Sequence, residues 1–254
     1  MNLPDFSKIF HQSSKNIDKI RASTPIKYED WPEEWKTTYY KAYPRLPKID
    51  LDADQQSASF DSALGKIFFD LIKKRKSQRD FSKTPITKRE LSLILKYSCG
   101  NTGPYEGERH RRAQPSGGMR FPIEVYPIIF RSAQDLKSGL YHYGVKNHEL
   151  DVLWDREFSD KEIDGLFNYD WVKNASCAII MTAVFWRNQN KYGERGYRMI
   201  LQESGHIGQN IYLVSEALGL KCCALSGTKD EALEKLIDID GITESVVYAL
   251  AIGN

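Results

Sequence analysis

Lys191 and Tyr192 are the neighbouring side chains with the clearest capacity for proton chemistry. A phenol next to an ammonium group can act as a base, because positive charge favours the phenolate and lowers the pKa of a phenol from its usual value of about 10. The pair precedes a long helix that the hydrophobic spacing predicts over residues 199–218. We therefore predict proton transfer at Tyr192. The alternative is an amphipathic tyrosine at a junction between a strand and a helix.

The predicted helix carries a polar strip of Glu203, His206 and Asn210, at spacings i, i+3 and i+7, with Gln202 and Gln209 beside it. Buried polar groups must find partners, so such a row serves a ligand, an interface or an ordered network unless the face is simply solvated. His206 has no second His or Cys at ligand spacing, and we expect no metal site.

Four residues near position 77 could bind an anion: Arg75, Lys76, Ser77 and Arg79. Arginine binds phosphate through two parallel hydrogen bonds, so three cations and a hydroxyl suit a phosphate monoester. The alternative is that the cations stabilise the dipole at the C-terminus of the helix predicted over 57–74.

Two short loops contain glycines that would let the backbone approach a flat ligand closely. They are Pro115, Ser116, Gly117 and Gly118, and then Leu225, Ser226 and Gly227. Each could instead be an ordinary turn. No Gly-x-Gly-x-x-Gly or Walker motif occurs, so a dinucleotide-binding or nucleoside-triphosphate-binding fold is not supported.

Hydrophobic periodicity places these residues in an α+β domain. Further helices are predicted over 87–100 and 228–236, opened by the capping boxes Thr87–Glu90 and Thr228–Glu231. Strands are predicted over 123–131, 139–143, 148–153, 177–184, 221–225 and 245–252. Because the two types intermix without regular alternation, we expect a mainly antiparallel central sheet flanked by helices.

Bulk composition excludes several classes of function. The 36 Lys and Arg residues nearly balance the 34 Asp and Glu residues, so the net charge of +2 indicates neither a nucleic-acid partner nor an anionic membrane surface. The four cysteines lack the spacing of zinc or redox sites and are expected to be reduced and buried. Without a signal pattern or an apolar run of about 20 residues, a cytoplasmic protein with no membrane association is predicted.

Residues 1–56 differ in composition and are predicted to form an N-terminal arm ahead of the main domain, 57–254. Trp31, Trp35, Tyr39 and Tyr43 are spaced by four, which would align their rings on one face of a helix. The arm would pack on its own domain or on a partner subunit, and contact with a peptide substrate is the alternative.

Taken in order, the motifs resemble those of the nitroreductase-like flavoproteins, specifically the SagB/McbC-type thiazoline/oxazoline dehydrogenases. The matching segments are 75–81, 115–118, 139–143, 191–198 and 203–210, within about 57–253. The resemblance implies FMN, an interlocked homodimer and a ribosomally made peptide substrate whose azoline rings are oxidised to azoles.

By this resemblance Lys191 and Tyr192 are catalytic, and Arg75, Lys76, Ser77 and Arg79 hold the phosphate and ribityl chain. Pro115 to Gly118 would approach the isoalloxazine from the partner subunit, Leu225 to Gly227 would line its other side, and Gln209 and Asn210 would support the cofactor site. Many relatives also place a basic residue after the last strand, whereas this sequence reads Gly253-Asn254 there. The phosphate would then depend more on Arg75 and Arg79.

Three functions follow as alternatives. The first is azoline oxidation, in which Tyr192 takes a proton from Cα and the hydride from Cβ goes to FMN N5. The second is an NAD(P)H-dependent flavin reductase of dehydroalanine, nitro or quinone substrates, with the pair as proton donor. The third is a non-catalytic docking scaffold in a peptide-modifying complex. A YcaO-type cyclodehydratase is a possible partner for the first.

Overall fold

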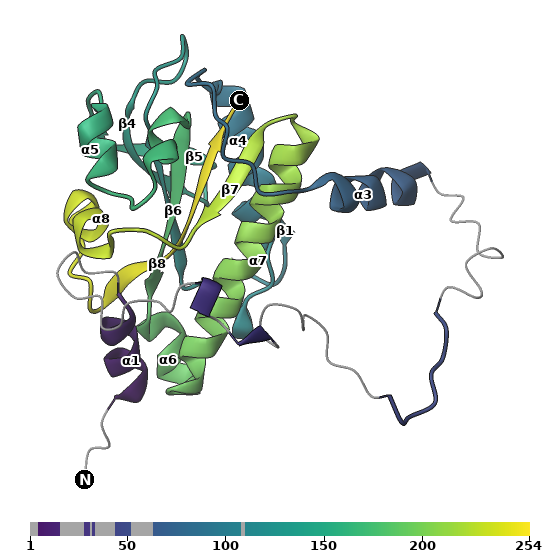
Figure 1. The fold of residues 1–254 in the computed structure, drawn as a ribbon. Coiled ribbons are helices and arrows are strands. Elements are labelled where there is room, and N and C mark those ends of the chain that lie inside the picture. The colour runs from purple at the N-terminus through teal and green to yellow at the C-terminus, as the bar shows by residue number, and fades with distance from the viewer. Residues whose placement is uncertain (1–4, 16–27, 31, 34–43, 52–62, 108–109) are drawn as a thin grey trace.

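Six antiparallel strands form the main sheet of the computed structural model, in the order β5-β4-β3-β6-β8-β7 (Figure 1). The structure describes residues 5–15, 28–30, 32–33, 44–51, 63–107 and 110–254. The six strands are β3 (Ile123–Ile129), β4 (Gly139–Gly144), β5 (Glu149–Asp155), β6 (Cys177–Val184), β7 (Lys221–Leu225) and β8 (Glu244–Gly253). A separate two-stranded sheet pairs β1 (Asn101–Pro104) with β2 (His110–Arg112). The antiparallel α+β prediction is confirmed.

Helices cover both faces of the main sheet. The α-helices are α1 (Phe6–Ser14), α3 (Ala63–Lys74), α4 (Lys88–Cys99), α5 (Asp160–Asp164), α6 (Trp186–Tyr192), α7 (Arg195–Ala217) and α8 (Asp230–Ile237). Short 3-10 turns are η1 (Tyr28–Asp30), η2 (Gly117–Met119) and η3 (Asp170–Asn174). One apolar cluster joins the sheet to α4 and α7, and a second joins the opposite face to α5, η3 and α8. The core therefore has two apolar layers with the sheet between them.

Strand β6 lies at the centre of this arrangement, and its side chains alternate between the two clusters. Ile179 and Met181 belong to the cluster under α4 and α7, whereas Ala178 and Ile180 belong to the other. A strand covered on both faces needs an almost continuous apolar run, as predicted for 177–184. The four cysteines are reduced and buried, also as predicted.

Helix α7 confirms the predicted long helix, although it begins four residues earlier, at Arg195. Its apolar stripe is buried at Ile200, Ile207 and Ile211. Helix α4 begins after the predicted capping box, since Thr87 accepts from the backbone of Glu90 and Glu90 accepts from that of Thr87. These two helices pack on each other and on the sheet.

The predicted capping box at Thr228 is wrong. Helix α8 begins at Asp230, and its N-cap residue Lys229 makes no side-chain cap bond. The Thr228 hydroxyl instead donates to Asp230 Oδ1 at 2.5 Å. Because α8 begins one residue later than a cap at Thr228 would require, the Thr228 hydroxyl bonds to the side chain of Asp230, the first residue of the helix.

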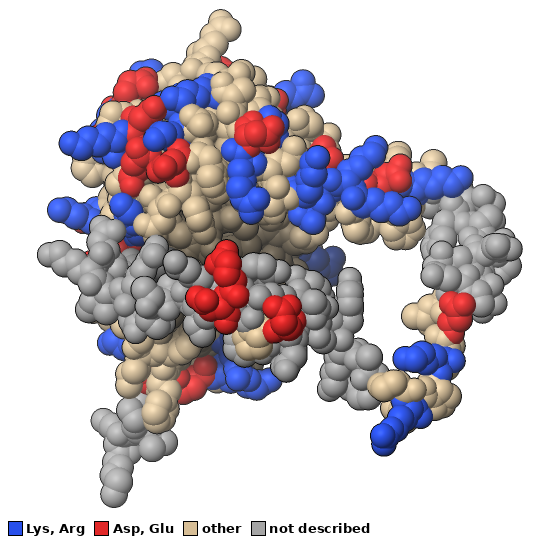
Figure 2. All heavy atoms as spheres, viewed as in Figure 1, with Lys and Arg blue, Asp and Glu red and all other residues tan. Residues whose placement is uncertain are grey.

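Helix α3 extends away from the domain, and its C-terminal end meets α7 (Figure 1). Its apolar side chains remain exposed in this chain, in contrast to those of α4 and α7: Leu64, Ile67, Phe68, Phe69 and Ile72. Figure 2 shows Lys and Arg side chains along α3 and near its junction with the domain. An amphipathic helix whose apolar face is uncovered needs a partner surface.

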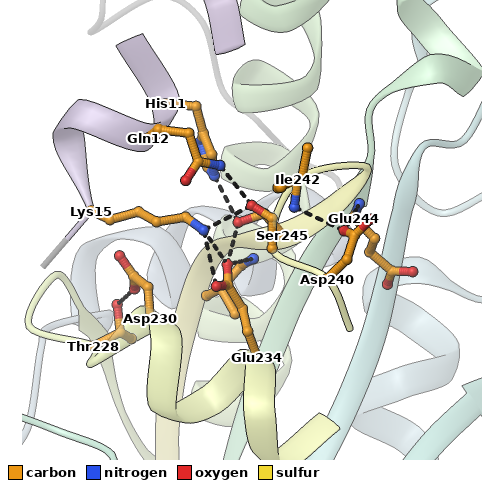
Figure 3. Close-up of polar contacts among 12 residues, drawn as sticks. His11, Gln12, Lys15, Thr228, Asp230, Glu234, Asp240, Ile242, Glu244 and Ser245 are labelled. Atoms are coloured by element: carbon orange, nitrogen blue, oxygen red, sulfur yellow. Dashed lines mark hydrogen bonds and ion pairs between the residues drawn. The ribbon is translucent and has the colours of Figure 1, made fainter. Parts of the chain in front are cut away.

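The described start of the N-terminal arm, Phe6–Lys15, packs against α7, α8 and β8 of its own chain (Figure 3). Lys15 Nζ lies 2.8 Å from Glu234 Oε1 and donates to the carbonyl of Gly241 at 2.8 Å, and both charged side chains are buried. His11 Nε2 lies 2.8 Å from Ser245 Oγ, which donates to Glu234. The predicted stripe at Trp31, Trp35, Tyr39 and Tyr43 lies outside the described residues.

Acid is expected to release this segment, because burial lowers the pKa of His11 from 6.5 to about 4, with Lys15 acting in the same direction. A depressed pKa means that docking is fully stabilised above pH 6.5 and loses stability as pH falls toward 4. Hydrogen exchange of the segment 5–15, corrected for its intrinsic pH dependence, should accelerate across this window. In the His11→Gln variant this acceleration of hydrogen exchange between pH 6.5 and 4 should be absent. Equal acceleration in that variant would contradict the assignment to His11.

Candidate active site

Lys191 and Tyr192 lie in the last turn of α6, a helix that the sequence did not predict. Gly193 follows with φ +55°, a left-handed conformation that lets the chain turn directly into α7. Lys191 Nζ lies 5.2 Å from the centroid of the Tyr192 ring, so the ammonium group faces the aromatic ring. The two side chains therefore form one unit at the junction of the helices.

The loop containing Pro115 to Gly118 lies against this pair within the same chain. A Cβ atom added at Gly118 would lie 2.5 Å from Tyr192 Oη and 3.2 Å from Lys191 Nζ. Gly118 also has φ +63°, so both space and backbone conformation require glycine. Two segments that the sequence singled out separately thus meet at Gly118. Within its own chain this loop contacts Lys191 and Tyr192. Its predicted approach to the isoalloxazine from the partner subunit stays a prediction.

Glu203 of α7 binds the loop that contains Pro115 to Gly118. Its carboxylate accepts from Ser116 Oγ at 2.5 Å and from Gln114 Nε2 at 3.3 Å, and only 2% of the residue is exposed. Burial raises the pKa of Glu203, while these two hydrogen bonds oppose the rise. Ser116 Oγ also accepts the backbone N–H of Phe121 at 2.9 Å. Glu203 therefore positions the loop that carries Gly118.

A second polar network, which the sequence did not predict, fixes the position of α6. Glu124 of β3 pairs with Arg187 of α6 and with His142 Nε2 at 3.0 Å. The hydrogen bond to Glu124 is the main cause that raises the pKa of His142 to about 9. Arg120 donates to the carbonyl of Arg187 at 2.6 Å. Contacts between distant strands and helices of this kind leave no local pattern in a sequence.

The predicted anion-binding residues lie beside β7 and the C-terminal half of α7. The backbone N–H of Gln78 donates to the carbonyl of Cys222 at 3.0 Å, which fixes the segment along the strand. Ser77 Oγ lies 2.9 Å from Tyr212 Oη, and the Arg75 guanidinium lies 5.3 Å from the centroid of the Tyr212 ring. Tyr212 thus organises the cluster, although the sequence reasoning did not single it out.

This cationic cluster meets the second glycine loop. Arg79 lies 5.9 Å from the centroid of the Trp171 ring, and Tyr169 stacks on Trp171 at 5.4 Å. Ser226 Oγ lies 3.0 Å from Tyr169 Oη, and a Cβ at Gly227 would lie 2.8 Å from the Tyr169 ring. Residues 75–79 and 225–227, which are far apart in sequence, therefore border the same aromatic pair.

The donor set of the cluster fits a phosphate. Within the described ranges, no carboxylate forms an ion pair with Arg75, Lys76 or Arg79. Asp80 pairs instead with Lys221 at 3.1 Å. Cations held close together by backbone and aromatic contacts, with a hydroxyl among them, suit a doubly charged anion.

The polar strip of α7 divides into different environments. Glu203 is buried, whereas His206 and Gln209 are exposed in this chain. Asn210 Nδ2 donates to the carbonyl of Ser98 at 3.1 Å and so joins α7 to α4. From Glu203 to Tyr212 the helix rises about 13 Å, so the loop around Gly118 and the cationic cluster lie at separate levels of α7.

Two kinds of feature are absent from the described part of the chain. It contains no cluster of His, Cys, Asp and Glu side chains suited to a metal ion. Nor does any of its helices combine the length and apolar character that a membrane crossing requires.

Comparison with known families identifies the fold around this site. The model of the nitroreductase family matches residues 72–254. The chain belongs to the nitroreductase family. Membership in this family supports an oxidoreductase, and it agrees with the resemblance carried by the sequence motifs.

Three relatives illustrate the range of this nitroreductase family. A nitroreductase-like protein of Methanocaldococcus jannaschii is 30% identical over 67% of this chain and 83% of its own length. The trifolitoxin-processing protein TfxB of Rhizobium leguminosarum is 31% identical over 64% of this chain and 46% of its own length. The microcin B17-processing protein McbC of Escherichia coli is 28% identical over 63% of this chain and 59% of its own length. The matched region thus spans about half the length of the two peptide-processing relatives.

Solved structures share the fold. A chain of the E. coli microcin synthetase McbBCD complex, solved with truncated pro-MccB17 bound, has a TM-score of 0.75 and 20% identity, covering 98% of this chain and 91% of that chain. A nitroreductase-family crystal structure from Anabaena variabilis has a TM-score of 0.59 and 25% identity. The match covers 97% of this chain and 45% of that chain.

Proposed function

We propose that this nitroreductase-family protein is an FMN-dependent dehydrogenase that oxidises azoline rings to azoles in a ribosomally synthesised peptide. The observation that carries the proposal is the convergence of Lys191 Nζ and Tyr192 Oη on Gly118. A phenol and an ammonium group there are placed to move a proton beside a backbone that only glycine can form. The trifolitoxin-processing and microcin B17-processing relatives support a peptide as the substrate.

Flavin binding is proposed because members of the nitroreductase family bind flavin and because the cationic cluster suits a phosphate. Arg75, Lys76, Ser77 and Arg79 would hold the phosphate and ribityl chain. The ring would lie among Pro115 to Gly118, Gln209, Asn210 and Leu225 to Gly227. When bound, FMN supplies the hydride acceptor of the reaction.

The residues of this chain supply proton transfer and orientation. Tyr192 is proposed to take the proton from Cα of the azoline, with Lys191 stabilising negative charge on the phenol oxygen. Glu203 and Ser116 keep Gly118 against the pair through their 2.5 Å hydrogen bond. Arg187 and Glu124 fix the helix that ends at Tyr192.

We propose that the protein is a homodimer. The exposed apolar face of α3 needs a covering surface, and a second copy would provide one. The separation of about 13 Å along α7 also favours a site completed by the partner, because the cationic cluster and the Lys191–Tyr192 pair lie at different levels of the helix. A YcaO-type cyclodehydratase in the cytoplasm would supply the azoline.

A second candidate function is the reduction of dehydroalanine, nitro or quinone substrates with NAD(P)H. The similarity to the nitroreductase-like protein of M. jannaschii, which extends over 83% of that protein, favours it. The Lys191–Tyr192 pair would then donate a proton rather than accept one.

One experiment separates the candidates. The FMN-loaded protein is incubated aerobically with a synthetic peptide that contains one thiazoline, and separately with NADPH without oxygen. Loss of two hydrogens from the peptide, seen by mass spectrometry, together with an unbleached flavin under NADPH supports the dehydrogenase. Rapid bleaching with an unchanged peptide supports the reductase. A colourless protein that refuses FMN would contradict both and favour a docking scaffold.

A further inference from the structure

A cavity of about 530 Å³ lies next to the loop that carries Gly118. It is lined by Asn101, His110, Arg112, Met119, Phe121, Val145 and Lys146. This volume is in the usual range of ligand pockets. The lining residues come from β1, β2, the turn between β4 and β5, and the residues that directly follow Gly118. None of them belongs to the candidate catalytic or flavin-binding residues.

The cavity has basic lining residues. His110, Arg112 and Lys146 line it, and no Asp or Glu is among the described lining residues. Arg112 and Lys146 form no ion pair with any described carboxylate. The Arg112 guanidinium lies 4.4 Å from the centroid of the Phe121 ring, which holds its plane in place. The charges of Glu124 and Glu203 also act on Arg112, although neither carboxylate forms an ion pair with it. A fixed guanidinium supported by a second cation suits a carboxylate.

Two of the lining residues, Met119 and Phe121, have an unfavourable backbone conformation. Met119 and Phe121 have φ of +53° and +46°, a left-handed conformation that residues with a side chain rarely adopt. The Met119 N–H donates to the carbonyl of Ser116 at 3.0 Å, and the Phe121 N–H donates to Ser116 Oγ at 2.9 Å. Arg187 donates to the Phe121 carbonyl at 3.3 Å. Backbone strain that is maintained by several hydrogen bonds is typical of ligand-binding and active sites.

The cavity lining adjoins, along the chain, the glycine that contacts the candidate catalytic pair. Met119 directly follows Gly118, and Gly118 contacts Tyr192 and Lys191. An extended peptide advances about 3.3 Å per residue, so a peptide whose ring lies at Tyr192 would place a residue only a few positions away in the cavity. The apolar surfaces of Met119, Phe121 and Val145 could contact the rest of that residue.

We propose that this cavity is a subsite that binds a carboxylate of the peptide substrate, close to the ring that is oxidised. The inference rests on the proposed peptide-modifying function and adds a selectivity for substrates that carry negative charge near the ring. The carboxylate could belong to an Asp or Glu side chain or to the C-terminus of the peptide. Both sources present the same chemistry to Arg112 and Lys146.

Three N-acetylated pentapeptides of one sequence can distinguish the sources. The first has a Glu and an amidated C-terminus, the second has Gln and a free C-terminus, and the third has Gln and an amide. Each is titrated into the full-length, FMN-loaded protein labelled with 13C at the methionine methyl groups. Met119 lines the cavity, whereas Met181 is fully buried in the core and serves as the internal reference.

A saturable shift of the Met119 signal with the first or second peptide, at least about tenfold tighter than with the third, is expected and identifies the source. Lys146→Gln should weaken that binding about two- to fivefold, as for an exposed charge, and Arg112→Gln should weaken it more. Lys137→Gln, a matched exposed lysine outside the cavity, should leave it unchanged. An unmoved Met181 signal verifies that each variant is folded.

Equal binding of all three peptides, or an equal loss in Lys137→Gln, would overturn the proposal. The titration detects binding without any azole formation, so its failure is separate from failure of the proposed function. A protein that prefers the carboxylates but never oxidises a thiazoline would keep the subsite and lose the proposed reaction. A protein that oxidises a thiazoline but binds the three peptides equally well would keep the proposed reaction and lose the subsite.

Discussion

Tyr192→Phe is expected to keep FMN bound and to lower azole formation by about two to four orders of magnitude, the usual contribution of a general base. The variant removes only the phenol oxygen, so the ring remains beneath the Lys191 ammonium group and the contact with Gly118 loses a single atom. The measurement is single-turnover conversion of a thiazoline peptide by the flavin-loaded protein, with flavin content read from its absorbance.

Two further variants test the interpretation of this result. Tyr97→Phe alters an exposed tyrosine of α4 and should leave turnover unchanged. Gly118→Ala should impair turnover while keeping the phenol, because the added Cβ would meet Tyr192 Oη at 2.5 Å and displace it. If Tyr192→Phe turned over at the wild-type rate, Tyr192 would not be the base and the proposed role of the pair would fail.

Replacement of Arg75 and Arg79 together by Gln is expected to weaken FMN binding by about two to four orders of magnitude. Each charge-assisted hydrogen bond to a phosphate contributes about 1.5–3 kcal/mol, and each 1.4 kcal/mol is a factor of ten in affinity. The replaced cations lie near Tyr212 and Trp171, where the described residues provide no carboxylate partner. Quenching of flavin fluorescence on titration measures the effect.

Riboflavin provides a control for this prediction because it lacks the phosphate. Its weaker binding should be the same in the double variant and in the wild type, and Lys66→Gln on α3 should change neither ligand. An equal loss of riboflavin and FMN binding would mean that the two arginines support the structure of the segment rather than contact the phosphate.

Much of the local structure could be predicted from the sequence. The capping box before α4, the apolar run of β6 and the stripe of α7 depend on residues a few positions apart, and each lies where predicted. Thr228 shows the limit of such reasoning, because its hydroxyl bonds to Asp230 Oδ1 and no capping box forms. Short helices such as α6 also escaped prediction, since seven residues carry too little periodic signal.

The sequence by itself determined the fold class, the order of the six main strands and the longer helices, and the residue types able to move a proton or bind a phosphate. Only the tertiary structure decided which of them meet. Ser116 and Glu203 are 87 positions apart, and Ser77 and Tyr212 are 135 positions apart. The carboxylate-binding cavity likewise draws on segments between 101 and 146. Side-chain spacing encodes a helix or a strand locally, but contacts between elements depend on how the whole core packs, and one sequence alone does not display that packing.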